Sequence, residues 1–426
     1  MLDIKLIRDD PERIRKAIRD KQMPEAQESL NQVLLLDEEA RLLRQDMEEK
    51  QALRNANSRK IGELKRKGES AETLMAEMAQ VSEEVKKLEE KTKTLEAQLN
   101  AAMLELPNPP HESVPYGESE HDNVIVKEWG EKPSFEFAAK PHWDLASAKG
   151  WIDLEAGVKV AGAGFPVLRG DGARLMRSLV QHSLNILTDE GYIEILPPLL
   201  VNEASALGTG SLPDKEGQMY EVTDGFYLIP TSEVPVTNLH RDEIVDSSAL
   251  PLRYTAHSPC FRREAGSYGA HVRGLNRVHQ FDKVEMVQIV KPETSYEVQE
   301  VMTLLVEHTL EALNLPYRRL LLCTGDMTFA GAKTYDLEVW SAGQDRWLEV
   351  SSVTNFETFQ SQRLKTRFRE GGAAGKGKPE LVHTLNGSLF GMVRLFAALL
   401  ENNQQEDGNV AVPEILRPYF GKEIME

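Results

Sequence analysis

One long segment without proline restricts the folds open to this chain more than any other feature. From about residue 30 to residue 104 the sequence is rich in Glu, Lys, Leu, Gln and Ala. In its second half the seam residues follow one another in alternating steps of four and three: Leu74, Met78, Val81, Val85, Leu88, Thr92, Leu95, Leu99 and Ala102. This spacing is the heptad seam of a coiled coil, so we expect a long helix packed along a partner helix.

The first half of the segment has a weaker seam of the same kind. It runs through Leu36, Ala40, Leu43, Met47, Ile61 and Leu64. Between the halves, Gly68 can end one helix and Ser70 can cap the next. The segment therefore predicts two antiparallel helices of about 30 residues each, forming a hairpin roughly 45–50 Å long.

The charge of this hairpin differs from that of the whole chain, whose net charge is -18. Seven basic residues face a single acid, Glu63, in its distal half: Lys50, Arg54, Arg59, Lys60, Lys65, Arg66 and Lys67. Phosphates respond to such local patches rather than to net charge. Two interpretations remain open, an arm that contacts RNA and a coiled coil that makes dimers.

A different architecture is expected after the hairpin. Prolines at 107, 109, 110 and 115 end the helix, so we take residues 1–106 as the arm and 107–120 as a linker. In residues 121–426, β-type runs (193–200, 278–290, 318–323 and 335–340) alternate with helical ones (173–187 and 296–313). This pattern predicts an α+β domain with a mainly antiparallel sheet flanked by helices.

Several classes of protein are disfavoured. The chain has neither Gly-x-Gly-x-x-Gly nor a Gly-Lys-Ser/Thr loop, and its two cysteines, Cys260 and Cys323, are too few for a disulfide framework or a cysteine-rich zinc site. No apolar stretch approaches the roughly 20 residues of a membrane helix, and the N-terminus has no signal-peptide core. We therefore expect a cytoplasmic protein without a membrane partner.

Residues 260–285 carry the strongest chemical pattern. Side chains two apart on a strand share a face, so Arg262 should project with Glu264, and Phe281 with Glu285 on the return strand. Such a hairpin offers a guanidinium for a phosphate, a ring for a base and carboxylates for an ammonium. From spacing alone, a surface hairpin with a salt bridge is an equal alternative.

A resemblance to a known family favours the first interpretation. Phe261-Arg262-x-Glu264 and its return strand resemble motif 2 of class II aminoacyl-tRNA synthetases. Residues 191–199 (GYIEILPPL) are similar to motif 1, whose proline lies at the dimer interface, and residues 392–394 (MVR) to motif 3.

Within that class, the chain resembles the bacterial-type seryl-tRNA synthetases. The supporting stretches are PTSE (230–233), AGSYG (265–269), HQFDKVE (279–285), KTYDLEVW (333–340) and LNGS (385–388). The match is collinear from residue 1 to about residue 420. The helical hairpin resembles that family's tRNA-binding arm.

The resemblance implies an ATP site with Mg²⁺. Arg262 would contact the α-phosphate, Glu264 and Val278 would recognise adenine, and Phe281 would stack on it. Glu349 and Ser352 would hold the metal, and Arg394 would hold the γ-phosphate, so that Arg262, Arg394 and Glu349 would be the catalytic residues. The full ATP-binding set is Arg262, Arg263, Glu264, Val278, Phe281, Glu349, Val350, Ser351, Ser352 and Arg394.

The resemblance also implies a serine pocket, formed by Thr231, Ser232, Glu233, Arg262, Glu285, Asn386 and Ser388. Asn386 and Ser388 are two apart and can share a strand face. Glu349 and Ser352 are three apart, so their strand must bulge or end there.

The implied activity is an ATP-dependent serine–tRNA ligase that forms seryl-adenylate and is homodimeric. It would need Mg²⁺ but no zinc, and its partners would be L-serine, tRNA(Ser) and tRNA(Sec). The arm's tRNA-binding residues would be Arg54, Arg59, Lys60, Lys65, Arg66 and Lys67.

Two other functions are alternatives. A ligase that loads an amino acid onto a carrier protein would lack the long arm, and a non-catalytic tRNA-binding paralogue would have lost Arg262, Glu264, Glu285 or Arg394. One departure from the family pattern, Phe390-Gly391 beside motif 3, bears on how Arg394 is aimed.

Overall fold

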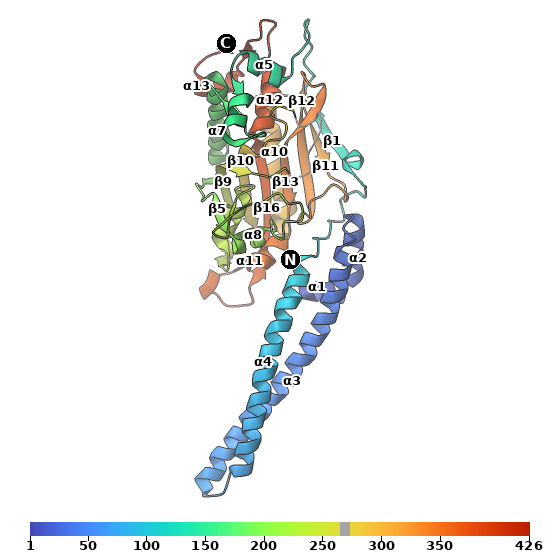
Figure 1. Ribbon diagram of the computed structural model, residues 1–426, viewed down its shortest axis with the longest axis vertical. Coiled ribbons are helices and arrows are strands. Elements are labelled where there is room, and N and C mark those ends of the chain that lie inside the picture. Colours follow the sequence, from blue (N-terminus) through green and yellow to red (C-terminus); the bar gives the residue numbers. More distant parts are fainter. Residues whose placement is uncertain (265–272) are drawn as a thin grey trace. The chain divides into compact units, whose positions relative to one another are not determined.

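The computed structural model describes residues 1–264 and 273–426, which form two compact units, Met1–Pro107 and Asn108–Glu426. The first unit is helical and the second contains a large sheet (Figure 1). Of the predicted linker 107–120, Pro107 belongs to the first unit and residues 108–120 to the second. Within the described residues, no helix has both the length and the apolar character needed to cross a membrane.

The first unit is the expected helical hairpin. Its helices are α1 (Ile4–Asp9), α2 (Pro11–Asp20), α3 (Ala26–Lys67) and α4 (Glu72–Leu104). Gly68 ends α3 in the left-handed conformation (φ 76°), as predicted. The predicted cap by Ser70 is wrong, because α4 starts one residue too late for it: its N-cap is Ala71, which makes no side-chain cap.

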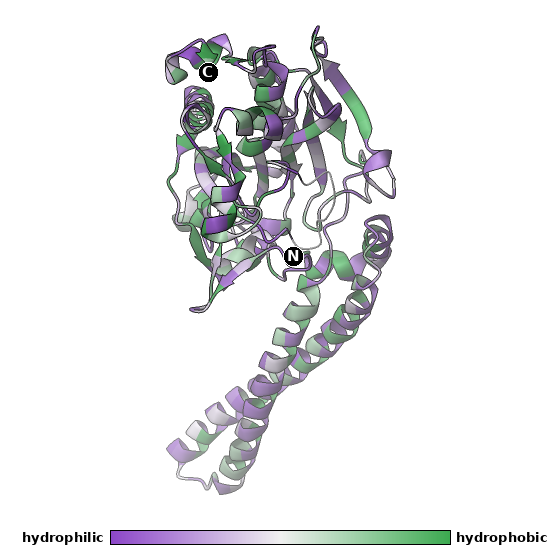
Figure 2. Ribbon diagram, turned by 45° about the horizontal axis from the view of Figure 1, so that its top comes forward, coloured by the Kyte–Doolittle hydropathy of each residue, from purple (hydrophilic) through white to green (hydrophobic). Residues whose placement is uncertain are grey.

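Burial along the helices confirms the heptad seam. All nine predicted positions of α4 are buried or half-buried, as are the six of α3. Ion pairs between the helices flank the seam, Arg44 with Glu96 at 2.6 Å and Lys50 with Glu84 at 2.7 Å. Outside the seam, most residues of both helices are hydrophilic (Figure 2). The two helices are therefore each other's partners along the seam.

The second unit is built on an eight-stranded sheet in the order β1-β11-β12-β13-β16-β10-β9-β4. Its pairs are antiparallel except for β4 with β9, which confirms the mainly antiparallel prediction. The strands are β1 (Val124–Trp129), β4 (Ile193–Glu194), β9 (Leu252–Phe261), β10 (Gln280–Val290), β11 (Tyr317–Leu321), β12 (Lys333–Ser341), β13 (Arg346–Asn355) and β16 (His383–Gly391).

Three long helices pack on one face of this sheet: α7 (Asp171–Asp189), α10 (Ser295–Ala312) and α12 (Met392–Asn402). On β10, Val284 and Met286 enter the core that these helices share with the sheet. Because strand side chains alternate, Phe281, Lys283 and Glu285 point to the opposite face. The core thus occupies one face and leaves the other for a site.

Shorter elements complete the second unit. The helices are α5 (His142–Ala148), α6 (Leu154–Ala161), α8 (Glu203–Thr209), α9 (Glu233–Thr237), α11 (Phe359–Leu364) and α13 (Arg417–Phe420). The strands are β2 (Ile152–Asp153), β3 (Val167–Leu168), β5 (Leu200–Asn202), β6 (Tyr220–Val222), β7 (Phe226–Leu228), β8 (Ile244–Asp246), β14 (Arg367–Arg369), β15 (Glu380–Leu381), β17 (Val410–Ala411) and β18 (Ile424–Met425).

The predicted strand 193–200 is wrong as one piece. It divides into β4 and β5, which belong to different sheets. Pro197 and Pro198 lie between them, and proline cannot donate a hydrogen bond to a ladder.

Candidate active site

A cavity of about 490 Å³ opens on the sheet face that the long helices leave free. Its walls come from β10, β13 and β16, the start of α12 and the chain before β6. Nine of the ten predicted ATP-binding residues line it: Arg262, Glu264, Val278, Phe281, Glu349, Val350, Ser351, Ser352 and Arg394. The structure thus gathers in one cavity residues that are up to 132 positions apart in the sequence.

One side of the cavity holds an arginine, a ring and a carboxylate. The Arg262 guanidinium lies over the Phe281 ring, 5.3 Å from its centroid. Strand β9 ends at Phe261, and Glu264 has a positive φ of 48°, so the prediction that Arg262 and Glu264 share a strand is wrong. Both nevertheless line the cavity. Glu264 also forms an ion pair with Arg277 at 3.0 Å. Arg277 is a cavity residue that the sequence analysis did not predict.

Arg394 lies at another part of the wall. Its Nε donates to the carbonyl of Asn276 at 3.0 Å, and its terminal nitrogen donates to the carbonyl and carboxylate of Glu349, at 3.0 and 3.2 Å. Beside motif 3, Phe390 is buried in the main core and Gly391 is the N-cap of α12. Arg394, in the first turn of that helix, lines the cavity.

A bulge brings Glu349 and Ser352 to one face, as their spacing predicts. Two adjacent residues of β12, Leu337 and Glu338, lie opposite Ser351 and Glu349 of β13. Val350, between those two residues of β13, therefore has no partner on β12. Ser352 lies opposite Asp336. Because Asp336 and Glu338 share a face of β12, the residues paired with them do so as well.

Asp336 is an acid in this group that was not predicted as a site residue. Burial, followed by the negative charge of Glu349, raises the pKa of its carboxyl well above the usual range. Its buried Oδ1 has no hydrogen-bond partner among the described residues. The sequence signal that could have identified Asp336 is its position in the KTYDLEVW stretch, two residues before Glu338.

A second polar group lies beside the cavity, around Glu285 on β10. This carboxylate is fully buried and accepts hydrogen bonds from the hydroxyls of Thr231 (3.3 Å) and Ser388 (3.4 Å). The side-chain amide of Asn386 donates to Glu285 at 2.8 Å and to Glu233 at 2.9 Å. Five of the predicted serine-binding residues thus form one connected network.

The two carboxylates of this network differ in their partners, one being paired with a cation and the other with neutral amides. Lys283, which also lines the cavity, forms an ion pair with Glu285. Glu233 instead accepts from the amides of Asn386 and Gln360 (2.6 Å). Burial, and then repulsion by Glu285, raise the pKa of Glu233 to about 7. Glu285 already has a cationic partner, so Glu233 is the carboxylate of this network that an added cation would stabilise most.

Two predicted residues belong neither to the cavity wall nor to the network around Glu285. The hydroxyl of the fully buried Ser232 donates to the carbonyl of Ala256 at 3.4 Å. The Arg263 guanidinium lies over the Tyr220 ring, 5.9 Å from its centroid, and Arg263 does not line the cavity. The AGSYG stretch at 265–269, used in the resemblance, lies outside the described residues.

The distal half of the hairpin is a separate candidate surface. Five of its six predicted RNA-binding residues are exposed, and Arg54 is half-buried. Nearer the base, Arg44, Lys50, Lys87 and Lys91 each pair with an acid of the hairpin. Among the described residues, no ion pair involves Arg54, Arg59, Lys60, Lys65, Arg66 or Lys67. Their charges are thus available to an external anion.

Comparisons with known proteins agree over the whole chain. A model of the seryl-tRNA synthetase N-terminal domain matches residues 1–110, and a model of the class II tRNA synthetase core domain (G, H, P, S and T) matches residues 219–403. The serine–tRNA ligase of Salinibacter ruber is 51% identical over 424 residues, covering 99% of this chain and 98% of that protein. The serine–tRNA ligase of Thermodesulfovibrio yellowstonii is 48% identical, covering 100% of both.

A solved structure is similar in fold as well. The seryl-tRNA synthetase of Pyrococcus horikoshii, complexed with ATP, has a TM-score of 0.93 and 35% identity, covering 100% of this chain and 99% of that one.

Proposed function

The chain belongs to the seryl-tRNA synthetases, the serine–tRNA ligases with a class II core, and we propose that its cavity is where ATP and L-serine react. ATP would occupy the part lined by Arg262, Phe281 and Arg394, and serine the network around Glu285. The observation that carries this assignment is the adjacency of the two groups, since Ser388 belongs to both. The same adjacency argues against a paralogue that has lost its active site.

The chemistry of the first step requires positioning and positive charge. The serine carboxylate attacks the α-phosphate, an O–P bond forms, and pyrophosphate leaves with the electrons of the broken P–O bond. Negative charge grows on the α-phosphate oxygens, where a fixed donor is worth most. Arg262 would supply that donor, because it lines the cavity beside Phe281, the proposed adenine platform. Glu233 and Glu285 would hold the serine ammonium.

The residues around Glu349 fit Mg²⁺. They offer carboxylate and hydroxyl oxygens, the ligands this ion prefers, and one buried carboxylate oxygen without a hydrogen-bond partner in the described part of the chain. Glu349 and Ser352 would hold the ion, with Asp336 behind them. When bound, Mg²⁺ would neutralise charge on the phosphates.

The second step would take place with tRNA(Ser), and also with tRNA(Sec), in the cytoplasm. The terminal ribose hydroxyl attacks the seryl carbonyl, and AMP leaves. The unpaired basic residues of the distal hairpin would contact the tRNA backbone.

We further propose a homodimer that pairs through the motif 1 segment. Ile193 is 58% exposed and Leu196 94% exposed, so large apolar side chains stand in solvent there. Such surfaces often mark interfaces.

Substrate choice gives the test of the proposed function. We expect serine to support exchange of pyrophosphate into ATP, and alanine to support almost none, because a pocket built to hydrogen-bond a hydroxyl is left unpaired by a methyl group. The measurement is isotope exchange with each of the twenty amino acids in turn. Exchange with an amino acid other than serine, or with none, contradicts the proposal.

The pKa of Glu233 predicts a pH dependence of serine binding. Below pH 7 its carboxyl is protonated and neutral, whereas above pH 7 it can pair with the serine ammonium. We therefore expect the KM for serine to fall as pH rises from about 6 to about 8, by up to about tenfold per unit below the pKa.

The control for this dependence is Glu233→Gln, which cannot titrate and should bind serine weakly with a flat profile over the same range. The KM for ATP should change with pH equally in both proteins. Parallel serine profiles for the two proteins would show that another group titrates.

A further inference from the structure

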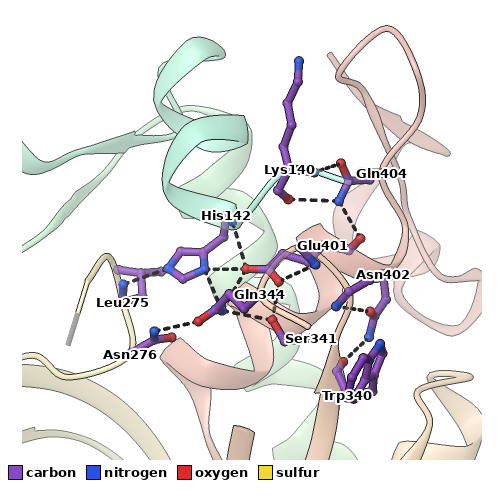
Figure 3. A network of polar contacts seen from close by, with 12 residues as sticks. Lys140, His142, Leu275, Asn276, Trp340, Ser341, Gln344, Glu401, Asn402 and Gln404 are labelled. Atoms are coloured by element: carbon purple, nitrogen blue, oxygen red, sulfur yellow. Dashed lines mark hydrogen bonds and ion pairs between the residues drawn. The ribbon is translucent and has the colours of Figure 1, made fainter. Parts of the chain in front are cut away.

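We propose that His142, which lies outside the cavity, is a positioning residue for ATP. It would hold the segment Leu275–Arg277, at the end of the loop that returns to β10, in the geometry that Arg394 and Glu264 need. The inference rests on the proposed ATP site. It concerns a buried network centred on His142 and Glu401, neither of which lines the cavity (Figure 3).

The network is centred on a buried histidine and a buried glutamate. His142 starts α5 and Glu401 lies near the end of α12, and both are fully buried. Glu401 Oε1 accepts from the backbone N–H of His142 (2.9 Å) and lies 2.7 Å from its ring Nδ1. Glu401 Oε2 accepts from the backbone N–H of Gly343 (3.0 Å) and the hydroxyl of Ser341. Glu401 is therefore fixed as an acceptor.

The hydrogen bonds also determine the form of the histidine. The backbone N–H of Leu275 donates to His142 Nε2 at 2.9 Å. A backbone N–H is always a donor, so Nε2 must be unprotonated, and the ring hydrogen lies on Nδ1, directed at Glu401. His142 thus links a carboxylate of α12 to the main chain of the loop with both ring nitrogens.

A second tie runs beside the first. The side-chain amide of Asn276 donates to Gln344 Oε1 at 2.8 Å, and Gln344 donates to Glu401 Oε1 at 2.9 Å. Gly274 packs closely as well, with φ at 71°, and a Cβ there would lie 2.3 Å from His142 Nε2. Two consecutive residues of the loop are therefore held from the same glutamate.

The held segment belongs to the cavity wall. Asn276 and Arg277 both line the cavity, and the carbonyl of Asn276 accepts from Arg394 Nε at 3.0 Å. Arg277 pairs with Glu264, the proposed adenine contact. A shift of Leu275 would move both contacts, whereas the residues around Glu285 come from other elements. The network should consequently affect the KM for ATP rather than the KM for serine.

Two matched substitutions separate this role from simple packing. In His142→Asn the amide can replace Nδ1 as the donor to Glu401, but Leu275 loses its acceptor. In His142→Gln the longer side chain places an oxygen near the position of Nε2, so Leu275 keeps its acceptor. A buried donor left without a partner costs more than a substituted bond, so we expect His142→Asn to raise the KM for ATP about tenfold or more and His142→Gln about threefold or less.

Kinetics of pyrophosphate exchange and thermal unfolding test the inference. In His142→Asn the KM for serine should stay within about twofold, and both variants should unfold at similar temperatures. In an Arg394→Ala background, His142→Asn should have a smaller effect on ATP than in the wild type, because the two act through Asn276. Should His142→Asn not fold, Gln344→Ala keeps the His142–Leu275 hydrogen bond and removes the second tie, together with the hydrogen bond from Gln344 to Ser341, at a half-buried position. It should raise the KM for ATP alone.

The inference is overturned if the asparagine and glutamine variants change the KM for ATP equally, if serine and ATP are affected alike, or if Gln344→Ala leaves ATP kinetics unchanged. Failure of the proposed function has a different signature, since the unmodified chain would then show no serine-dependent exchange.

Discussion

Replacing Arg262 with alanine should lower serine-dependent pyrophosphate exchange by about 10²–10³-fold, because loss of one fixed donor to developing charge costs about 2.7–4 kcal/mol. The fold should survive, since Arg262 lies beyond the end of β9 at the cavity wall and its packing contact is the Phe281 ring. The measurement is kcat/KM for exchange, with thermal unfolding alongside it.

The neighbouring arginine is a matched control for this prediction. Arg263 has the same charge but lies outside the cavity, over Tyr220. Arg263→Ala should therefore stay within about threefold of the parent, a change of less than about 0.7 kcal/mol. Equal losses at the two positions would mean that general positive charge, rather than the placement of Arg262, supports the reaction.

Changing the six distal arm residues to glutamine should nearly abolish tRNA charging while leaving pyrophosphate exchange unchanged. Each lost phosphate contact should flatten the log–log salt dependence of tRNA affinity by roughly 0.7–0.9. Arg54, Arg59, Lys60, Lys65, Arg66 and Lys67 have no acid partners among the described residues, so the substitution breaks no ion pair within the arm. Binding titrations at several salt concentrations, beside both activity assays, measure the effect.

A shortened arm and a control variant with lysines of α4 neutralised complete the experiment. Deleting residues 54–83 and closing the gap with a short turn keeps the Lys50–Glu84 ion pair and most of the buried seam. It should reproduce the loss of charging. Neutralising Lys86, Lys87, Lys91 and Lys93 instead should have a weaker effect, because two of them already pair with acids. If the arm were a dimerisation coiled coil, the deletion would give monomers in sedimentation and reduce both reactions.

The sequence predicted best what depends on local periodicity. The hairpin follows from a repeated seven-residue pattern, and the bulge in β13 follows from the spacing of Glu349 and Ser352, two residues that the resemblance assigns to one site. Ser70 failed as a cap because the start of a helix depends on one residue, and a pattern does not determine a boundary that finely.

Contacts between distant parts of the chain could not be predicted in this way. In the sequence, Lys283 and Asp336 look like ordinary strand residues. Only the fold shows that Lys283 pairs with Glu285, and only the pairing of β12 with β13 brings Asp336 opposite Ser352. His142 and Glu401 are 259 residues apart, and nothing in either neighbourhood indicates the other. Arg263 and Ser232 are the converse case. Arg263 adjoins two cavity residues in sequence, and Ser232 adjoins two residues of the network around Glu285, yet both side chains make their contacts elsewhere.

The extra residue at Val350 also limits how this strand can change over time. Side chains of a strand alternate between faces, so gaining or losing one residue here would exchange the faces for everything on one side of it. Val353, now in the core, and Ser352, now in the cavity wall, would swap places. Surface loops of this protein can drift in length through insertions and deletions, but residues 349–352 must keep their number even where their side chains are replaced.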